Sequence, residues 1–216
     1  CEGDWINVEN PANKTVFARV PRAKAADVDL AVAAAKRAFK PWARTAAAER
    51  GRILYQITDA IEKNKEKLAR LISSENGNAL RTQSRGEAAL TVEAFRYVAG
   101  LSREIKGKTP YLSSENLDYT RRAPYAGTLN VLSGTGLECG APLVDHPDVP
   151  KISFTGSTAV GKSILAAASK RVAAVTLELG GKSAQIVFPD VDIDYTTDGV
   201  MTAMRFSRQG QSCTAG

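Results

Sequence analysis

Apolar residues recur at helical spacing through the first hundred positions of the chain. In residues 25–39 they fall three and four positions apart on one face, from Val28 to Phe39, with charged residues opposite. Residues 47–74 and 87–104 repeat the pattern, and Gly77 is a plausible C-terminal stop for the longer of these two stretches. The pattern predicts three amphipathic helices that serve as core and scaffold.

The texture changes after about residue 117. Short β-prone runs at residues 129–132, 151–154, 175–177 and 186–188 are each followed by turn residues, and helical patterns occupy residues 161–175 and 192–206. Strands that alternate with helices are typical of an α/β domain with a largely parallel sheet. The sequence therefore predicts an N-terminal helical part followed by an α/β part.

Composition and charge narrow the class of protein. The chain has 216 residues, of which 44% are hydrophobic and 24% are charged, and its net charge of +6 is spread along amphipathic stretches rather than packed into one block. We read the basic residues as solvated helix faces and expect neither a nucleic-acid nor a membrane partner. The longest apolar runs fall far short of the roughly 20 residues that cross a bilayer, so a cytoplasmic protein is expected.

The cysteines exclude two common kinds of site. Cys1, Cys139 and Cys213 are odd in number and widely spaced, which fits neither a disulfide framework nor the ligand spacing of a metal site. Reduced thiols and no bound metal are expected. Cys139 is predicted to lie on a helix face, and His146, the only histidine, is predicted to be a surface-turn residue.

One segment matches a nucleotide-binding motif. Residues 156–163 satisfy G-x-x-x-x-G-K-[ST] between a predicted strand and a predicted helix. In a P-loop nucleotide hydrolase, Lys162 would contact the outer phosphate and Ser163 would bind Mg²⁺. The same residues also suit a turn between a strand and a helix that only glycine permits, so the motif alone leaves both interpretations open.

Two further residues are candidates for catalysis. Glu178 ends a β-prone run just before Gly180 and Gly181, and two glycines let a backbone approach a ligand closely. Cys213 lies in a loop of small and polar residues that would line a core poorly, where a thiol can be accessible and reactive. A solvated carboxylate and an inert buried thiol are the simpler readings of each residue taken alone.

Together these motifs resemble those of aldehyde dehydrogenases. The chain carries Phe154-Thr155-Gly156-Ser157-Thr158-x-x-Gly161, then Glu178-Leu179-Gly180-Gly181-Lys182, then Gly210-Gln211-x-Cys213, in the order of the family's cofactor turn, base motif and nucleophile motif. The similarity extends to Asn10-Pro11-Ala12 and to residues 39–42, 119–124 and 127–134. It covers nearly the whole chain, and under it the P-loop match is a coincidence of the family's Gly-Ser-Thr turn.

The resemblance implies a reaction and its residues. Cys213 would attack an aldehyde carbonyl, hydride would pass to NAD or NADP, and Glu178 would activate the water that hydrolyses the resulting thioester. The residues implied for cofactor binding are Gly156, Ser157, Thr158 and Gly161 at the phosphates, Gly134 and Gly136 on the adenine side, Leu179 and Gly180 near the nicotinamide, and Phe154 and Thr155, which begin the cofactor turn.

The resemblance also implies a fold and an assembly. Residues 1–182 would form a dinucleotide-binding domain with a Rossmann-like parallel sheet and N-terminal helices, and residues 183–216 would begin a second, catalytic α/β domain. The region around Tyr119 would be an oligomerisation strand. A homo-oligomer, dimeric or tetrameric, that acts on a small aldehyde is expected.

The sequence departs from the family pattern in two places. Only Ala126 stands between Pro124-Tyr125 and Gly127, where relatives carry a long segment with a Pro-Trp-Asn motif for the oxyanion and a Lys-Pro-x-Glu motif for the ribose. The chain also stops three residues after Cys213. We expect it to be part of a longer protein, and a non-catalytic truncated relative is the third interpretation.

Overall fold

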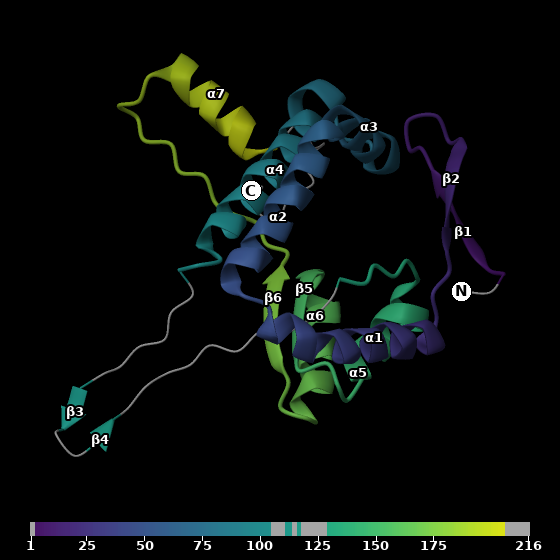
Figure 1. Ribbon diagram of the computed structural model, residues 1–216. Coiled ribbons are helices and arrows are strands. Elements are labelled where there is room, and N and C mark those ends of the chain that lie inside the picture. Colours follow the sequence, from purple (N-terminus) through teal and green to yellow (C-terminus); the bar gives the residue numbers. More distant parts are fainter. Residues whose placement is uncertain (1–2, 105–110, 114–115, 118–128, 206–216) are drawn as a thin grey trace. The chain divides into compact units, whose positions relative to one another are not determined.

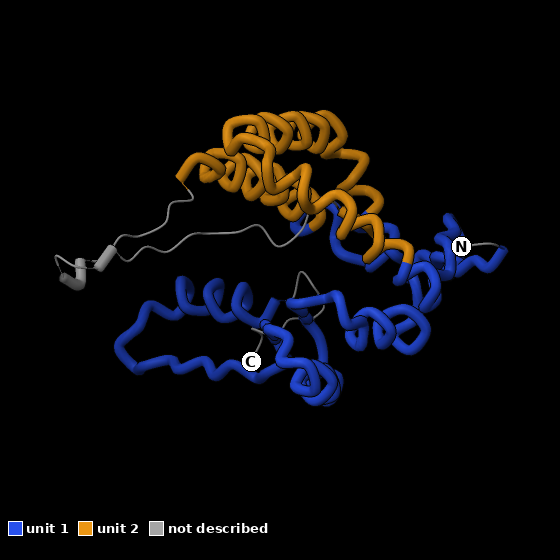
Figure 2. Tube along the Cα trace, turned by 60° about the horizontal axis from the view of Figure 1, so that its bottom comes forward, with its two compact units in different colours: residues 1–29, 72–83, 132–216 blue, residues 30–71, 84–131 orange. Residues whose placement is uncertain are grey.

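The computed structural model describes residues 3–104, 111–113, 116–117 and 129–205 (Figure 1). The chain divides into two compact units: residues 1–29, 72–83 and 132–216 form the first, and residues 30–71 and 84–131 form the second (Figure 2). Among the described residues, no helix is both long and apolar enough to cross a membrane.

The first unit opens with an antiparallel hairpin. Strands β1 (Trp5–Glu9) and β2 (Val16–Pro21) pair from Trp5 with Pro21 to Glu9 with Val16. The intervening turn is closed by a hydrogen bond from the Asn10 N–H to the Thr15 carbonyl oxygen and by side-chain acceptors on Asn10 and Asn13. The hydrophobic pattern of the sequence does not predict this hairpin.

The first unit also contains a parallel β-α-β arrangement. Strand β5 (Lys151–Gly156) leads into helix α6 (Thr158–Ser169), which returns to strand β6 (Ala174–Leu179), and β5 and β6 are parallel (Figure 1). Ile152, Ile164 and Ala168 form the buried centre, against which Phe154, Val175 and Leu177 pack. The prediction of an α/β fold with parallel strands is confirmed.

Shorter helices complete this unit. The helical segment η2 (Gly136–Gly140) continues into α5 (Ala141–Asp145), which contacts α6, and α7 (Ile193–Ala203) follows an extended stretch after β6. Cys139 lies buried in η2, as predicted for a helix-face thiol. His146 follows α5 with only 13% of its side chain exposed, so the expectation of a surface-turn residue holds for the turn and fails for the exposure.

The described part of the second unit is mainly helical. Helices α2 (Ala47–Lys63) and α4 (Arg85–Leu101) pack along each other through small buried residues, which include Gly51, Thr58, Ala88, Val92 and Ala99. A side chain on Gly51 would collide with Ser102, so the glycine permits the close approach of the two helices. Helices α1 (Ala25–Arg44) and α3 (Lys65–Asn76) each have residues in both units.

The predicted helices are correct in kind and differ in their bounds. The single helix expected over residues 47–74 is interrupted at Asn64, whose side-chain amide donates to the Ala60 carbonyl oxygen at 2.8 Å. Gly77 follows α3 with a positive φ of 79°, a conformation that glycine adopts without strain, so the predicted stop is confirmed. A π-helical segment, η1 (Leu80–Ser84), precedes α4.

Two predicted strands are wrong. Residues 129–132 and 186–188 form no strand, and all of their apolar side chains except Leu132 are exposed, with Leu129 at 84% and Ile186 at 78%. A strand exists only with a hydrogen-bonded neighbour, and no described segment pairs with either stretch. The remaining strands among the described residues are β3 (Tyr111–Ser113) and β4 (Asn116–Leu117), which pair antiparallel. Tyr119, in the predicted oligomerisation region, lies outside the described residues.

Candidate active site

The predicted cofactor turn and the predicted base meet at one edge of the parallel strands. In the register of β5 and β6, Thr155 is opposite Glu178 and Gly156 is opposite Leu179, so both strands end at the same level. Ligands of open α/β sheets bind at the carboxyl ends of the strands, because the loops that follow the strands gather there. The structure therefore brings residues 154–158 together with residues 178–180.

The two faces of the strand pair differ in polarity. Phe154 and Leu177 pack on the buried cluster beside α6, whereas Thr155 and Glu178 are exposed. Side chains alternate between the faces of a strand, so Thr155 and Glu178 share the face opposite that cluster. The Glu178 carboxylate is thus held by a rigid strand and remains accessible to solvent.

The turn after β5 is shaped by a glycine and by a helix cap. A side chain on Gly156 would collide with the ring of Phe154, which packs over this position. Ser157 has the extended conformation of an N-cap residue, and its hydroxyl oxygen accepts a hydrogen bond from the Val160 N–H at 3.3 Å. The first N–H groups of α6 have no partner within the helix, which makes its N-terminus suited to an anion.

Gly161 fastens α6 to β6. It is buried, and a methyl group in its place would lie 2.6 Å from Cδ2 of Leu179. Its N–H donates to the Ser157 carbonyl oxygen at 2.9 Å. The glycine therefore brings the helix close to the strand that carries Glu178, while the cofactor contact expected of Gly161 stays a prediction.

The P-loop interpretation fails on the same helix. A P-loop places its Gly-Lys-Ser at the N-terminus of a helix, after a loop whose N–H groups surround phosphates. Here α6 begins at Thr158, so Lys162 and Ser163 lie inside the helix, and the Ser163 hydroxyl donates to the Ala159 carbonyl oxygen at 3.2 Å. The Gly161 N–H, which a P-loop would direct at the phosphates, donates to the Ser157 carbonyl oxygen instead.

The Gly134–Gly136 turn is packed against neighbouring residues at Gly134 and has open space beside it at Gly136. A methyl group on Gly134 would lie 2.5 Å from Cβ of Cys139 and 2.8 Å from the Ala23 carbonyl oxygen. Gly136 is exposed, as Gly134 is, but a methyl group there would meet nothing within 4 Å. A ligand can approach the backbone at Gly136, as the adenine-side prediction requires.

Three residues that were not predicted from the sequence hold this turn. The Arg22 guanidinium donates to both carboxylate oxygens of Glu138, at 2.8 and 3.0 Å. Thr135 and Glu138 cap the helical segment: the Thr135 hydroxyl donates to Glu138 Oε2 at 2.9 Å and accepts from the Glu138 N–H at 3.2 Å. The Thr-x-x-Glu spacing of a capping box is readable in the sequence, whereas its ion pair with Arg22 is not.

Contacts around the turn shift the pKa values of Glu138 and Cys139. The Arg22 hydrogen bonds and charge, with the Thr135 hydroxyl, lower the pKa of Glu138 below its ordinary value. Burial, together with the nearby Asp27 carboxylate, raises the pKa of the Cys139 thiol. Because a thiolate is the reactive form, Cys139 has the character of a structural thiol. Cys213, the predicted nucleophile, lies outside the described residues.

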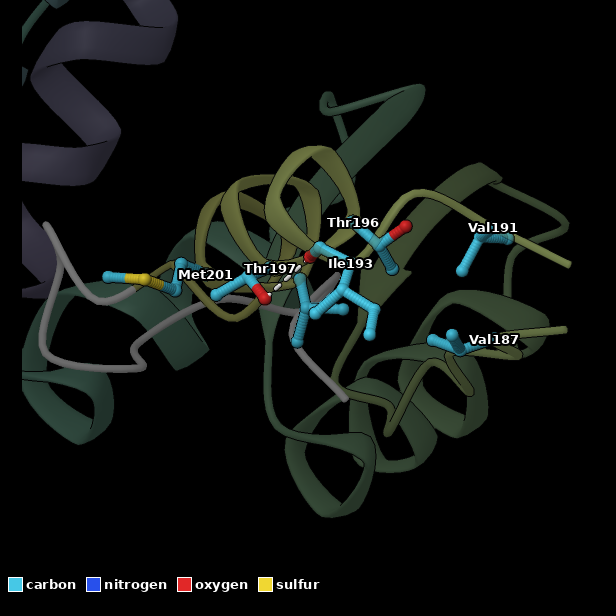
Figure 3. Close-up of a pocket in the computed structure, with 7 residues that line it drawn as sticks. Val187, Val191, Ile193, Thr196, Thr197 and Met201 are labelled. Carbon is cyan, nitrogen blue, oxygen red and sulfur yellow. Dashed lines mark hydrogen bonds between the residues drawn. The ribbon is translucent and has the colours of Figure 1, made fainter. Parts of the chain in front are cut away.

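A separate hollow follows the strand pair in sequence. It has a volume of about 300 Å³ and lies between the stretch before α7 and one side of that helix (Figure 3). The side chains that line it are Val187, Val191, Ile193, Thr196, Thr197, Val200 and Met201. The Thr197 hydroxyl donates to the Ile193 carbonyl oxygen within the helix at 2.8 Å. The lining offers no ionisable group, so the hollow contributes no acid, base or nucleophile.

The chain resembles known proteins in both sequence and structure. The model of the family described as "Aldehyde dehydrogenase family" matches residues 1–128 and 125–216. The chain is 31% identical to the putative aldehyde dehydrogenase DhaS of Bacillus subtilis (strain 168), with 100% of this chain and 55% of that protein covered. The solved NAD⁺ complex of an aldehyde dehydrogenase from Bacillus cereus is 31% identical, with a TM-score of 0.92 over 99% of this chain and 55% of that chain. An NADP-dependent enzyme of E. coli is 27% identical, with a TM-score of 0.93 over 99% of this chain and 56% of that chain.

The alignments also show what the chain lacks relative to these proteins. It spans about half the length of the relatives it matches. The alignment with the Bacillus subtilis protein runs over 273 positions against the 216 residues of this chain, so at least 57 aligned positions have no residue here. The two stretches matched by the family model overlap at residues 125–128, where only Ala126 stands in place of the long segment of the family pattern.

Proposed function

Because the chain belongs to the aldehyde dehydrogenase family, we propose that it carries the cofactor turn, base and nucleophile of an enzyme that oxidises an aldehyde to a carboxylic acid with NAD or NADP. The observation that carries this proposal is the level register of β5 and β6, which brings the Gly156–Thr158 turn beside Glu178. The named nicotinamide complex and the NADP-dependent relative support the cofactor class.

The residues at the carboxyl ends of β5 and β6 fit a dinucleotide. The N-terminus of α6, with Ser157 and Thr158 at its start, suits a pyrophosphate, because oriented N–H groups and the helix dipole favour negative charge. Gly180, at the end of β6, is exposed, and a methyl group there would meet nothing within 4 Å, so a flat ring can approach this backbone. Ser157 and Thr158 would hold the phosphates, and Leu179 and Gly180 would lie beside the nicotinamide.

The bound cofactor would supply the hydride acceptor. Cys213 would attack the aldehyde carbonyl carbon through its sulfur, forming a thiohemiacetal, and loss of hydride from that carbon would leave a thioester on Cys213. Glu178 would accept a proton from water as the water attacks the thioester carbon, which releases the acid and returns the thiol. The two residues divide the work between a strong nucleophile and a carboxylate base.

The position of Glu178 supports this role. A general base must reach a water molecule and be held in place by its surroundings. Glu178 is exposed on a strand that is anchored by Val175 and Leu177 beneath it, so its backbone is rigid and its carboxylate is open to water.

The absence of the segment between Tyr125 and Gly127 suggests a second candidate function. In the family pattern that segment supplies an oxyanion donor, and the loss of one such donor costs about 10²–10³ in rate. At least 57 aligned positions have no residue in this chain, which favours a relative that binds dinucleotide with little or no turnover.

We also propose a cytoplasmic location, a homo-oligomer and a domain boundary between residues 182 and 183.

An assay of the full chain tests the proposed function. The chain is incubated with NAD⁺ or NADP⁺ and a short aliphatic aldehyde, and formation of the reduced cofactor is followed by absorbance. We expect a signal that Cys213→Ser abolishes and Glu178→Gln reduces, while Glu93→Gln, which removes an exposed carboxylate on α4, leaves it unchanged. Binding of NAD⁺ without turnover supports the second candidate, and the absence of any dinucleotide binding refutes both.

A further inference from the structure

The segment before α1 is joined to the Gly134–Gly136 turn by three separate contacts. The Ala23 N–H donates to the Ser133 carbonyl oxygen at 2.7 Å, and the Ala23 carbonyl oxygen lies against Gly134. Arg22 adds the bidentate pair with Glu138, across 116 positions of sequence. A two-point pair between a planar guanidinium and a carboxylate fixes direction as well as distance.

Glu138 is fixed from both sides. Arg22 binds both of its oxygens, and the Thr135 hydroxyl donates to one of them. Thr135 itself is extended, with φ −74° and ψ 157°, and stands between the two glycines of the turn. The two glycines have no side chain to fix their conformation, so the neighbouring contacts must do so.

The outer side of the turn is the side open to a ligand. Gly136 and Leu137 are exposed, Leu137 at 86%, whereas Cys139 beneath them is 6% exposed. A turn that is anchored below and open above presents its backbone in one shape. Preorganisation of this kind lowers the entropy lost when a ligand binds.

We propose that Arg22 and Glu138 are a positioning pair that holds the Gly134–Gly136 turn in the shape that receives the adenosine half of the nicotinamide cofactor. This inference rests on the proposed function, because that function brings NAD or NADP to the turn. Neither residue contacts the reacting atoms, so their removal weakens cofactor binding and leaves the chemical step unchanged.

The variants that test the pair are Arg22→Gln, Glu138→Gln and the double variant. Glu138→Gln keeps an oxygen for the Thr135 hydroxyl, so it removes the charge with little change to the cap. Lys24→Gln is the matched control: Lys24 comes two residues after Arg22 and forms a more exposed ion pair with Asp4, at 2.7 Å. The control removes one cation from the same segment without touching the turn.

Two measurements are made on the full chain. The dissociation constant for NAD⁺ is obtained by calorimetry, and the rate at which a thiol reagent labels Cys139 is obtained by peptide mapping. Cys139 reports on the anchor because its Cβ lies directly under Gly134. For an active chain, the KM for NAD⁺ and kcat are measured as well.

Each single variant is expected to weaken NAD⁺ binding about two- to fivefold, the range of a partly exposed ion pair, and to speed labelling of Cys139. The double variant should be no weaker than the single ones, because the two side chains act as one unit. Arg22→Lys should restore part of the affinity. The KM for NAD⁺ should rise with kcat unchanged, and Lys24→Gln should change neither binding nor labelling.

Three results would overturn the inference alone: unchanged NAD⁺ affinity in the single variants despite faster labelling, an effect of Lys24→Gln as large as that of Arg22→Gln, or additive losses in the double variant. If the unmodified chain binds neither NAD⁺ nor NADP⁺, the proposed function fails and the positioning role fails with it.

Discussion

Gly134 lies directly against Ala23, with a methyl group in its place 2.8 Å from the Ala23 carbonyl oxygen and 2.5 Å from Cβ of Cys139. Neither atom can move aside easily, because the Ala23 oxygen belongs to the backbone and the Cys139 Cβ is the first atom of a buried side chain. We predict that Gly134→Ala lowers the free energy of unfolding by about 1–3 kcal/mol, the usual cost of overpacking. Gly136→Ala, two residues along, meets open space and should leave it nearly unchanged. Thermal or urea unfolding of both variants tests this, and equal losses would show that the two segments are not in close contact.

A strained residue closes the turn between α6 and β6. Val172 has a positive φ of 57° and is 93% exposed, so a β-branched residue sits in a conformation that glycine prefers. We expect Val172→Gly to raise the free energy of unfolding by about 1 kcal/mol, since relief of the strain outweighs the greater flexibility of the unfolded chain. The comparison variant Val172→Ala keeps a Cβ and should gain less. A Val172→Gly protein less stable than the parent in urea unfolding would contradict the strained geometry.

The helical unit should lose stability in acid through one carboxylate. Hydrogen bonds and charge from Arg85, with help from Arg70, lower the pKa of Glu66 from 4.5 to about 2. The folded state therefore binds the proton less readily than the unfolded state, and the stabilisation is complete above about pH 4.5 and lost as the pH falls through about 2. Glu66→Gln and Arg85→Gln should both be less stable than the parent at pH 6 and should converge with it near pH 2. The change will be modest and sensitive to salt, because both side chains are about half exposed. Melting temperatures across this pH range measure it, and parallel curves for all three proteins would refute the assignment.

The sequence predicts the helices well because their evidence is local. The 3.6-residue period finds α1, α4, α6 and α7, with ends that differ by up to six residues, but it misses the short segment η1 and the interruption at Asn64, since one polar residue does not disturb the apolar stripe. Strands are harder, because a strand depends on a distant partner. The β-prone runs at 129–132 and 186–188 resemble those that become β5 and β6, yet they find no neighbour among the described residues.

The candidate site divides in the same way. The motifs around Gly156 and Glu178 are visible in the sequence, and the parallel register then explains why they meet at one edge. The Arg22–Glu138 pair could not be foreseen, because 116 positions separate the two residues and neither stands out beside the other charged residues. Long-range side-chain pairs require the three-dimensional structure.

We propose that Cys213 forms a thioester that Glu178 helps to hydrolyse, and the most direct test is to trap that thioester. The Glu178→Gln chain is mixed with NAD⁺ and a short aliphatic aldehyde, quenched in acid, and digested for mass spectrometry of the three cysteine peptides. We expect an acyl group on the Cys213 peptide, dependent on NAD⁺ and absent from the peptides of Cys1 and Cys139. An unmodified Cys213 peptide, or an acyl group on another cysteine, would contradict it.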